Sequence, residues 1–209
     1  MGFGIAFLGY CFLLMHSAGL GIVAAPVLAY GFFLASRLER SFLYASVSAL
    51  FMLPRGIFVL LDVFLPILGV EINLAQQLPY VNLGTYLLFF IAWFFMLMYQ
   101  CMGVRNIAVA NDHEKLKNSA NRQLYISSLF LAIAVTMVIC GEVVDIRITT
   151  FAAVAYYVVL LMNLFFTHTC LVLITSEEQY EKDKEMVAEH NRQVLERKKK
   201  DAERSKKRK

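Results

Sequence analysis

The sequence has few of the charged residues that a soluble domain of its size places on its surface. Only 17% of the 209 residues are Asp, Glu, Lys or Arg, whereas 59% are apolar or aromatic. Proline is scarce as well, with 4 residues, and 17 Phe and 10 Tyr exclude a disordered or collagen-like chain. A soluble domain this small keeps much of its surface in water and has no core large enough for so many apolar side chains. We therefore expect an integral membrane protein.

The few charges are concentrated at one end of the chain. Residues 1–175 hold 15 of the 36 charged residues, and the last 34 residues hold the other 21. This distribution predicts an all-α fold in two parts, a transmembrane helical domain over residues 1–175 and a charged cytosolic helical tail over residues 176–209. The tail contains no Gly or Pro and is rich in strong helix formers, which favours a helix.

Long apolar runs delimit the expected spans, since crossing about 30 Å of hydrocarbon takes about 20 apolar residues in a helix. We predict six spans, at about residues 3–15, 20–36, 42–65, 80–103, 124–146 and 149–175. The first two come from one uncharged run, residues 2–36, which as a single helix would be about 52 Å long. Turn-forming residues from His16 to Gly21 favour a hairpin of two short helices. One tilted helix, giving five spans, is the alternative.

Lysine and arginine indicate the orientation, because cytoplasmic loops of membrane proteins carry an excess of both. With six spans, 18 Lys and Arg lie on the cytoplasmic side, Arg147 alone lies outside, and Arg55 lies within a span. We therefore expect a multi-pass protein of the cell membrane with its C-terminus in the cytoplasm. The hairpin also places the N-terminus there, whereas five spans place it outside.

Four charged residues form a candidate intramembrane polar site: Arg55, Asp62, Glu142 and Asp145. Arg55 lies near the middle of the third span, where an Arg costs at least a few kcal/mol and should face a partner or water. Pro54 leaves the carbonyl of Leu50 without its helical donor, so a kink would open a polar notch there. The functional interpretation is an anion or lipid-headgroup site, or part of an ion path. The alternative is a structural ion pair between Arg55 and one of the acids.

The three acids of this set lie towards the outer ends of their spans. With Glu71 on the outer loop they would form an acidic outer vestibule, four acids against Arg147, that attracts cations by focusing the electric field. A solvated helix end without further function is the alternative.

The basic end of the tail is the second candidate site. Residues 177–196 carry a net charge of −4 and residues 197–209 one of +7. A basic segment is attracted to anionic lipid by about 1 kcal/mol per residue near the surface, and it also suits an acidic cytosolic protein. Its residues include Arg197, Lys198, Lys199, Lys200, Lys206, Lys207, Arg208 and Lys209. No aromatic residues interleave with them, which argues against nucleic acid. The alternative is a segment that only fixes orientation and solubility.

Signatures of catalysis and of metal or cofactor binding are missing from the sequence. It contains no Gly-x-Ser-x-Gly, no His-Glu-x-x-His and no phosphate-binding glycine loop. His16 and His168 have no second ligand at metal spacing, and the four Cys all fall inside spans without a Cys-x-x-Cys pair. We predict no metal, no cofactor and no catalytic residues, although a membrane enzyme without these motifs stays open.

Small residues at helical spacing predict two helix contacts, because helix interfaces in lipid favour side chains that let backbones approach. One set lies on the third span (Ser41, Ala45, Ala49 and Gly56), and the other lies on the fifth span (Ser128, Ala132, Thr136 and Cys140). We expect both faces to meet helices rather than lipid.

The start of the chain resembles a known group of proteins. The run Ala29-Tyr30-Gly31-Phe32-Phe33-Leu34 and the following Arg37-Leu38-Glu39-Arg40 are similar to small uncharacterised multi-pass membrane proteins of Gram-positive bacteria. The resemblance covers about the first quarter of the chain. It implies an inner-membrane protein and no particular activity.

The leading functional interpretation is a non-enzymatic accessory or scaffold protein whose tail contacts lipid headgroups or a cytosolic partner. The alternative is a small transporter or channel that uses the buried Arg and the acidic outer vestibule. A membrane enzyme is the third. The expected partner throughout is the lipid bilayer, and a homo-oligomer stays open.

Overall fold

The computed structural model describes residues 2–69, 74–139 and 153–174, and in these ranges all regular structure is helical. Three of the described helices are long and apolar enough to cross a membrane: Ser41–Ile67, Pro79–Ala110 and Ala153–Ile174. The chain divides into two compact units, Met1–Cys170 and Leu171–Lys209. The first contains the helical bundle. Of the second, the structure describes residues 171–174, the last turn of the helix Ala153–Ile174.

The N-terminal apolar run folds into two antiparallel helices, α1 (Gly2–Leu14) and α2 (Gly21–Ala35). A short 3-10 turn, η1 (His16–Ala18), joins them and ends at Gly19, whose φ of +85° suits a residue without a Cβ. The predicted hairpin is confirmed, and the single tilted helix is wrong. The helices have 13 and 15 residues and are about 20 and 22 Å long. Both are shorter than the about 20 residues that a crossing takes, and neither is among the three candidate spans.

The next candidate span consists of two helices end to end, α3 (Ser41–Leu50) and α4 (Leu53–Ile67). Pro54 lies in the first turn of α4 and has no N–H to donate to the Leu50 carbonyl. The chain therefore tightens between the two helices, where the Met52 N–H donates to the Ala49 carbonyl at 3.1 Å. The helix is thus interrupted just before Pro54, where the sequence suggested a kink.

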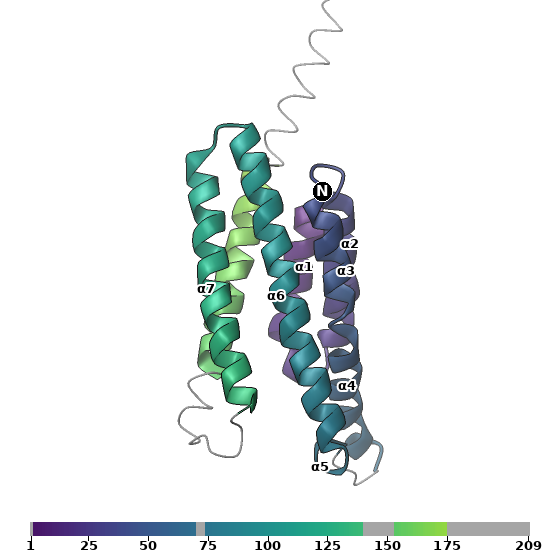
Figure 1. Ribbon diagram of the computed structural model, residues 1–209. Coiled ribbons are helices and arrows are strands. Elements are labelled where there is room, and N and C mark those ends of the chain that lie inside the picture. Colours follow the sequence, from purple (N-terminus) through teal and green to yellow (C-terminus); the bar gives the residue numbers. More distant parts are fainter. Residues whose placement is uncertain (1, 70–73, 140–152, 175–209) are drawn as a thin grey trace, which may run out of the picture. The chain divides into compact units, whose positions relative to one another are not determined.

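A 32-residue helix, α6 (Pro79–Ala110), follows the short α5 (Leu74–Gln77) and organises the bundle. It packs against α3 and α4 on one side and against α7 (Glu114–Ile139) on another (Figure 1). Both helices continue beyond the predicted spans, because α6 runs to Ala110 and α7 begins at Glu114.

The small-residue face of the third span is packed as predicted. Ala45 and Ala49 are fully buried. Gly56 lies against the start of α2, where a Cβ on it would come within 2.6 Å of the Ile22 backbone nitrogen. Ser46, between the two alanines, donates its hydroxyl hydrogen to the Ala29 carbonyl of α2 at 2.7 Å. Small side chains thus let the backbones of two elements approach, as lipid-embedded helix pairs require.

The corresponding prediction for the fifth span is wrong. Ala132 and Thr136 are exposed on α7, and Cys140 lies outside the described residues. The Thr136 hydroxyl donates to the Ala132 carbonyl of its own helix at 2.8 Å, so this face can meet lipid with its polar group paired. The buried face of α7 carries instead Gln123, Ser127, Phe130 and Ala134.

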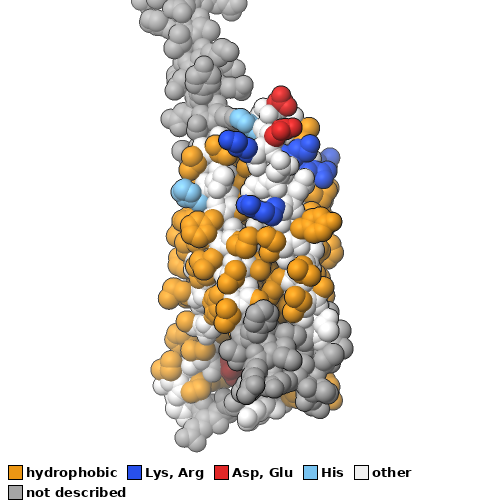
Figure 2. Space-filling view, turned by 90° about the vertical axis from the view of Figure 1, so that its left-hand side faces the viewer, with side chains coloured by type: hydrophobic (Ala, Val, Ile, Leu, Met, Phe, Trp, Pro, Cys, Tyr) orange, Lys and Arg blue, Asp and Glu red, His pale blue; other side chains and the backbone are white. Residues whose placement is uncertain are grey.

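The surface of the bundle is apolar over most of its length, with charges gathered towards one end (Figure 2). Large hydrophobic side chains such as Phe33, Phe51 and Phe165 are more than half exposed. Such a surface, together with three long apolar helices, is what a membrane protein presents to lipid.

Apart from Arg55, the Lys and Arg of the bundle's described residues flank the α2–α3 and α6–α7 connections. Both connections lie at the end of the bundle where α1 begins (Figure 1), which we call the basic end. The opposite end, where α4 finishes and α6 starts, we call the distal end. The residues of the basic end are Arg37, Arg40, Arg105, Lys115, Lys117 and Arg122.

Candidate intramembrane polar site

Arg55 lies in the first turn of α4 and is half-buried. Its Nη1 donates to Oδ1 of Asn82 in α6 at 2.6 Å. Its guanidinium carbon lies 4.3 Å from the centre of the Tyr86 ring and 5.5 Å from that of Phe58. The Nε atom is buried and has no hydrogen-bond partner. The cation is therefore oriented by an amide and two ring faces, and one of its donors is left unfilled.

These partners differ from the acids that the sequence suggested. The Asp62 carboxylate accepts a hydrogen bond from the Leu74 N–H at 3.0 Å and so ties α4 to α5. Glu142 and Asp145 lie outside the described residues, so their place in a vestibule stays a prediction. The partners of Arg55 were predicted from opposite charge. Asn82 and Tyr86 are neutral, so that criterion did not select them.

The tip of the α1–α2 hairpin lies close to this site. His16 is stacked on Phe89 with ring centres 5.1 Å apart, and its ring lies 6.2 Å from that of Tyr156. Phe89 lies about 15 Å along α6 from its start at the distal end. His16, at the tip of the hairpin, therefore lies beside the middle part of α6 and not at the distal end, and the side of the membrane that it faces stays a prediction.

A buried polar network lies deeper in the bundle. The Tyr10 hydroxyl donates to Oε1 of Gln100 at 2.6 Å, and Nε2 of Gln100 donates to the Thr167 hydroxyl at 2.8 Å. Nε2 of Gln123 donates to Oδ1 of Asn163 at 2.5 Å. These five side chains, from α1, α6, α7 and the helix Ala153–Ile174, are at most 4% exposed. In lipid, polar groups need such internal partners because no bulk water reaches them.

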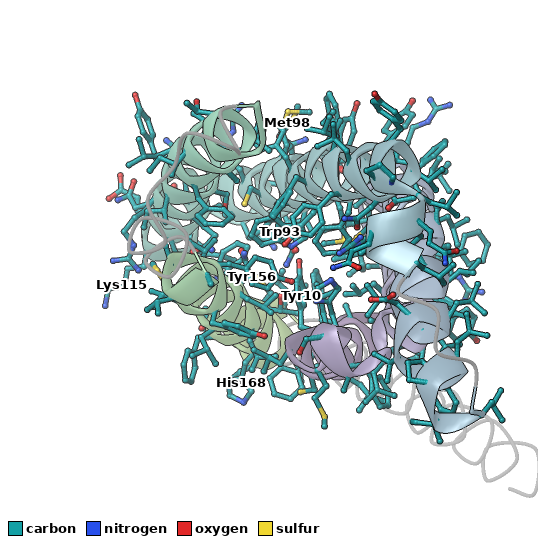
Figure 3. The ribbon with its side chains drawn as sticks, turned by 90° about the horizontal axis from the view of Figure 1, so that it is seen from below. Tyr10, Trp93, Met98, Lys115, Tyr156 and His168 are labelled. Atoms are coloured by element: carbon teal, nitrogen blue, oxygen red, sulfur yellow. The ribbon has the colours of Figure 1, made fainter. Side chains whose placement is uncertain are left out.

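Several polar atoms in this region have no partner. Within the part of the chain that the structure describes, the buried side-chain nitrogen and oxygen atoms without a hydrogen bond are Arg55 Nε, Trp93 Nε1, Ser127 Oγ, Tyr156 Oη and Asn163 Nδ2. The Trp93 and Tyr156 rings are 5.6 Å apart, and Figure 3 shows both side chains directed into the bundle. Native interiors leave few polar groups unpaired, so each of these invites an explanation.

The polar residues follow one face of α6. Asn82, Tyr86, Trp93 and Gln100 are separated by four, seven and seven residues, which places them on one side of a helix. The sequence analysis missed this row because neutral side chains in an apolar span carry no charge signal. The spacing itself is visible in the sequence and could have revealed it.

The remaining predicted residues contribute less. His168 is exposed, points away from the bundle (Figure 3) and contacts only the ring of Phe7 among the described aromatic pairs, at 5.8 Å. Within the described ranges, no three His, Cys, Asp or Glu side chains come together as a metal site would require. The tail residues 197–200 and 206–209 lie outside the described residues.

No family model, no curated protein and no solved structure matches the chain. Its function is therefore inferred from its own residues.

Proposed function

We propose that this protein is a small membrane transporter or channel with a polar solute site at Arg55. The observation that supports it best is the buried, unpartnered Nε of Arg55 in a segment long and apolar enough to span a membrane. An Arg inside a bilayer costs several kcal/mol unless it faces a partner or water. Asn82 and Tyr86 contact part of the guanidinium, and the buried Nε donor remains for a solute.

The proposed topology follows from the charges of the bundle. Cytoplasmic segments carry the excess of Lys and Arg, so we place the basic end in the cytoplasm. Because α1 begins at that end (Figure 1), its N-terminus lies there too. The α1–α2 hairpin then enters from the cytoplasm, turns beside Phe89 and returns, as a re-entrant segment rather than two full spans. Ser17 and Ala18, at its tip, are exposed.

The accessory or scaffold function remains a second proposal, favoured by the tail. Its net charge changes from −4 over residues 177–196 to +7 over residues 197–209. A block of one sign at the end of a chain suits contact with anionic lipid or an acidic protein.

Flux out of proteoliposomes tests the first proposal. The full chain is reconstituted, and the release of an internal salt load is followed in wild type, Arg55→Gln and Arg105→Gln. Arg105 is an exposed Arg of the basic end, so its variant matches the charge change outside the site. We expect flux to fall at least about tenfold in Arg55→Gln alone, because a hydrogen bond to a charged group is lost. Equal flux in all three proteins would contradict the proposal.

Co-purification tests the second proposal. In one full-length variant the nine Lys and Arg of residues 197–209 become Gln, and in a control variant the seven acids of residues 177–196 become Gln. A specific protein or anionic lipid retained by wild type and the control, and lost from the first variant, would support the scaffold. Identical retention by all three would count against it.

A further inference from the structure

The unpartnered atoms of the interior share one chemical property, since all of them can donate a hydrogen bond. The indole Nε1 of Trp93 and the guanidinium Nε of Arg55 carry hydrogen and have no acceptor capacity. Nδ2 of Asn163 is likewise a donor, because Oδ1 of that amide already accepts from Gln123. The hydroxyls of Ser127 and Tyr156 can turn a hydrogen towards the same space. The interior therefore has a surplus of donors.

Four of these donors lie along one interface inside the bundle. Trp93, Ser127 and Asn163 are at most 1% exposed, and Tyr156 is 8% exposed. The Phe130 ring lies 5.7 Å from that of Trp93 and 6.2 Å from that of Tyr156. Ser127 lies one turn before Phe130 on α7, and Asn163 lies two turns after Tyr156 on its helix. The four groups thus come from α6, α7 and the helix Ala153–Ile174.

This interface is continuous with the site at Arg55. Tyr86, under the guanidinium, lies two turns from Trp93 on the same face of α6. Between them, the Phe90 ring lies 5.2 Å from that of Tyr86 and 6.2 Å from that of Tyr156. Successive donors can therefore receive a ligand that enters at Arg55.

A surplus of donors selects an acceptor. A cation requires oxygen ligands, whereas three of the five unpartnered atoms are nitrogens that present a hydrogen to the ligand. A neutral solute such as an amide brings donors of its own, and among these atoms only the Ser127 and Tyr156 hydroxyl oxygens could accept from them. A small anion accepts from every direction, and the Arg55 charge attracts it.

We propose that the side chains of Trp93, Tyr156, Ser127 and Asn163 bind a small inorganic anion of halide size. The proposal names the ligand of the transport function proposed above and rests on that function for the entry through Arg55. Binding itself can be measured separately from transport.

Trp93 provides the signal, because it is the single Trp of the chain. Bromide quenches indole fluorescence on contact, and chloride occupies the same kind of site without quenching. The full chain in detergent is titrated with sodium bromide at constant ionic strength, kept by sodium gluconate, and the titration is repeated with added sodium chloride. We expect quenching that saturates and that chloride reverses.

Two conservative variants test whether the quenching of Trp93 by bromide depends on the unpartnered donors. Ser127→Ala removes an unpartnered hydroxyl, whereas the control Ser128→Ala removes one that already donates to the Leu124 carbonyl at 2.8 Å. Tyr156→Phe removes a single oxygen atom and serves if Ser127→Ala does not fold. We expect each of the two site variants to weaken bromide binding about fivefold to tenfold, and Ser128→Ala to leave it unchanged.

Each outcome separates the anion site from the transport function. Quenching that rises linearly with bromide, unaffected by chloride and equal in all variants, overturns the anion site. If such quenching accompanies Arg55-dependent flux, the transporter stands and its ligand is of another class. If binding saturates but the proteoliposomes show no flux, the anion site stands and the transport function fails.

Discussion

Arg55 illustrates at the residue scale how a charged group is accommodated inside an apolar bundle. Its guanidinium is oriented by Asn82 and by the face of Tyr86, and not by a carboxylate of the described residues. A neutral partner orients the cation without cancelling its charge, so the site keeps its attraction for an anion. A structural ion pair would have removed that attraction.

Replacing Asn82 tests this arrangement. Asn82→Ala leaves a partly buried guanidinium nitrogen without its acceptor, which costs about 1–3 kcal/mol. We expect a lower midpoint of thermal unfolding in detergent and a weaker anion affinity. The control is Asn118→Ala, at an exposed position of α7. An unchanged midpoint in Asn82→Ala would mean that this hydrogen bond does not orient Arg55.

Glu39, in the α2–α3 connection, gives a pH-dependent prediction. Burial alone would raise its pKa, but hydrogen bonds from Ser41 and Asn106 outweigh it and lower the pKa below the ordinary value of 4.5. The Ser41 N–H donates at 2.5 Å and Nδ2 of Asn106 at 3.1 Å. A lowered pKa means that the folded state prefers the carboxylate, so its contribution to stability is complete above pH 4.5 and is lost as the pH falls through the lowered pKa.

The comparison with Glu39→Gln measures this contribution. We expect the variant to be less stable than wild type at neutral pH and the difference to shrink as the pH is lowered below 4.5. Thermal unfolding in detergent at a series of pH values measures it. A difference that stayed constant across the series would show that ionisation of Glu39 contributes nothing to the fold.

At the scale of the helices, close backbone contacts determine how the elements pack. The hairpin α1–α2 is held against the α3–α4 segment by small residues, and Gly56 is the tightest point between α4 and α2. Gly56 directly follows Arg55 in the chain, so this contact fixes the position of the hairpin tip along the bundle relative to Arg55. A change in helix packing there therefore changes the site as well.

The two glycines of spans three and four give a matched pair. A Cβ at Gly56 would lie 2.6 Å from the Ile22 nitrogen, whereas one at Gly84 would meet nothing within 4 Å. We expect Gly56→Ala to destabilise the bundle by about 1–3 kcal/mol through overpacking. Gly84→Ala should be neutral or stabilise by up to about 1 kcal/mol, since Ala favours helix more than Gly. Equal unfolding midpoints for both variants would contradict the observed approach of α4 to α2.

At the scale of the whole molecule, the important asymmetry lies between the two ends of the bundle. The basic end carries the described Lys and Arg other than Arg55, while the polar row on α6 starts at the distal end with Asn82. The α1–α2 hairpin begins at the basic end and turns beside Phe89. The distal part of the bundle is therefore built by α4, α6 and the elements that pack against them.

The proposed topology predicts that both termini are cytoplasmic. A fluorescent protein and alkaline phosphatase, each fused in turn to the N-terminus of the full chain, report its side of the membrane. We expect fluorescence without phosphatase activity, and the same from C-terminal fusions, since basic segments stay inside. Phosphatase activity from the N-terminal fusion alone would replace the re-entrant hairpin with a different path for α1.

The sequence by itself determined the class of protein, the hairpin in residues 2–35, the helix break before Pro54 and the packed face of the third span. Each depends on local chemistry: apolar length, turn-forming residues, a missing N–H and the size of neighbouring side chains. The partners of Arg55, the depth of His16, the buried face of α7 and the row of donors were decided by the tertiary structure alone. Lipid and protein interior are equally apolar, so hydropathy does not distinguish the helix face that meets lipid from the one that meets another helix. Only the packed bundle shows which neutral polar side chains face each other.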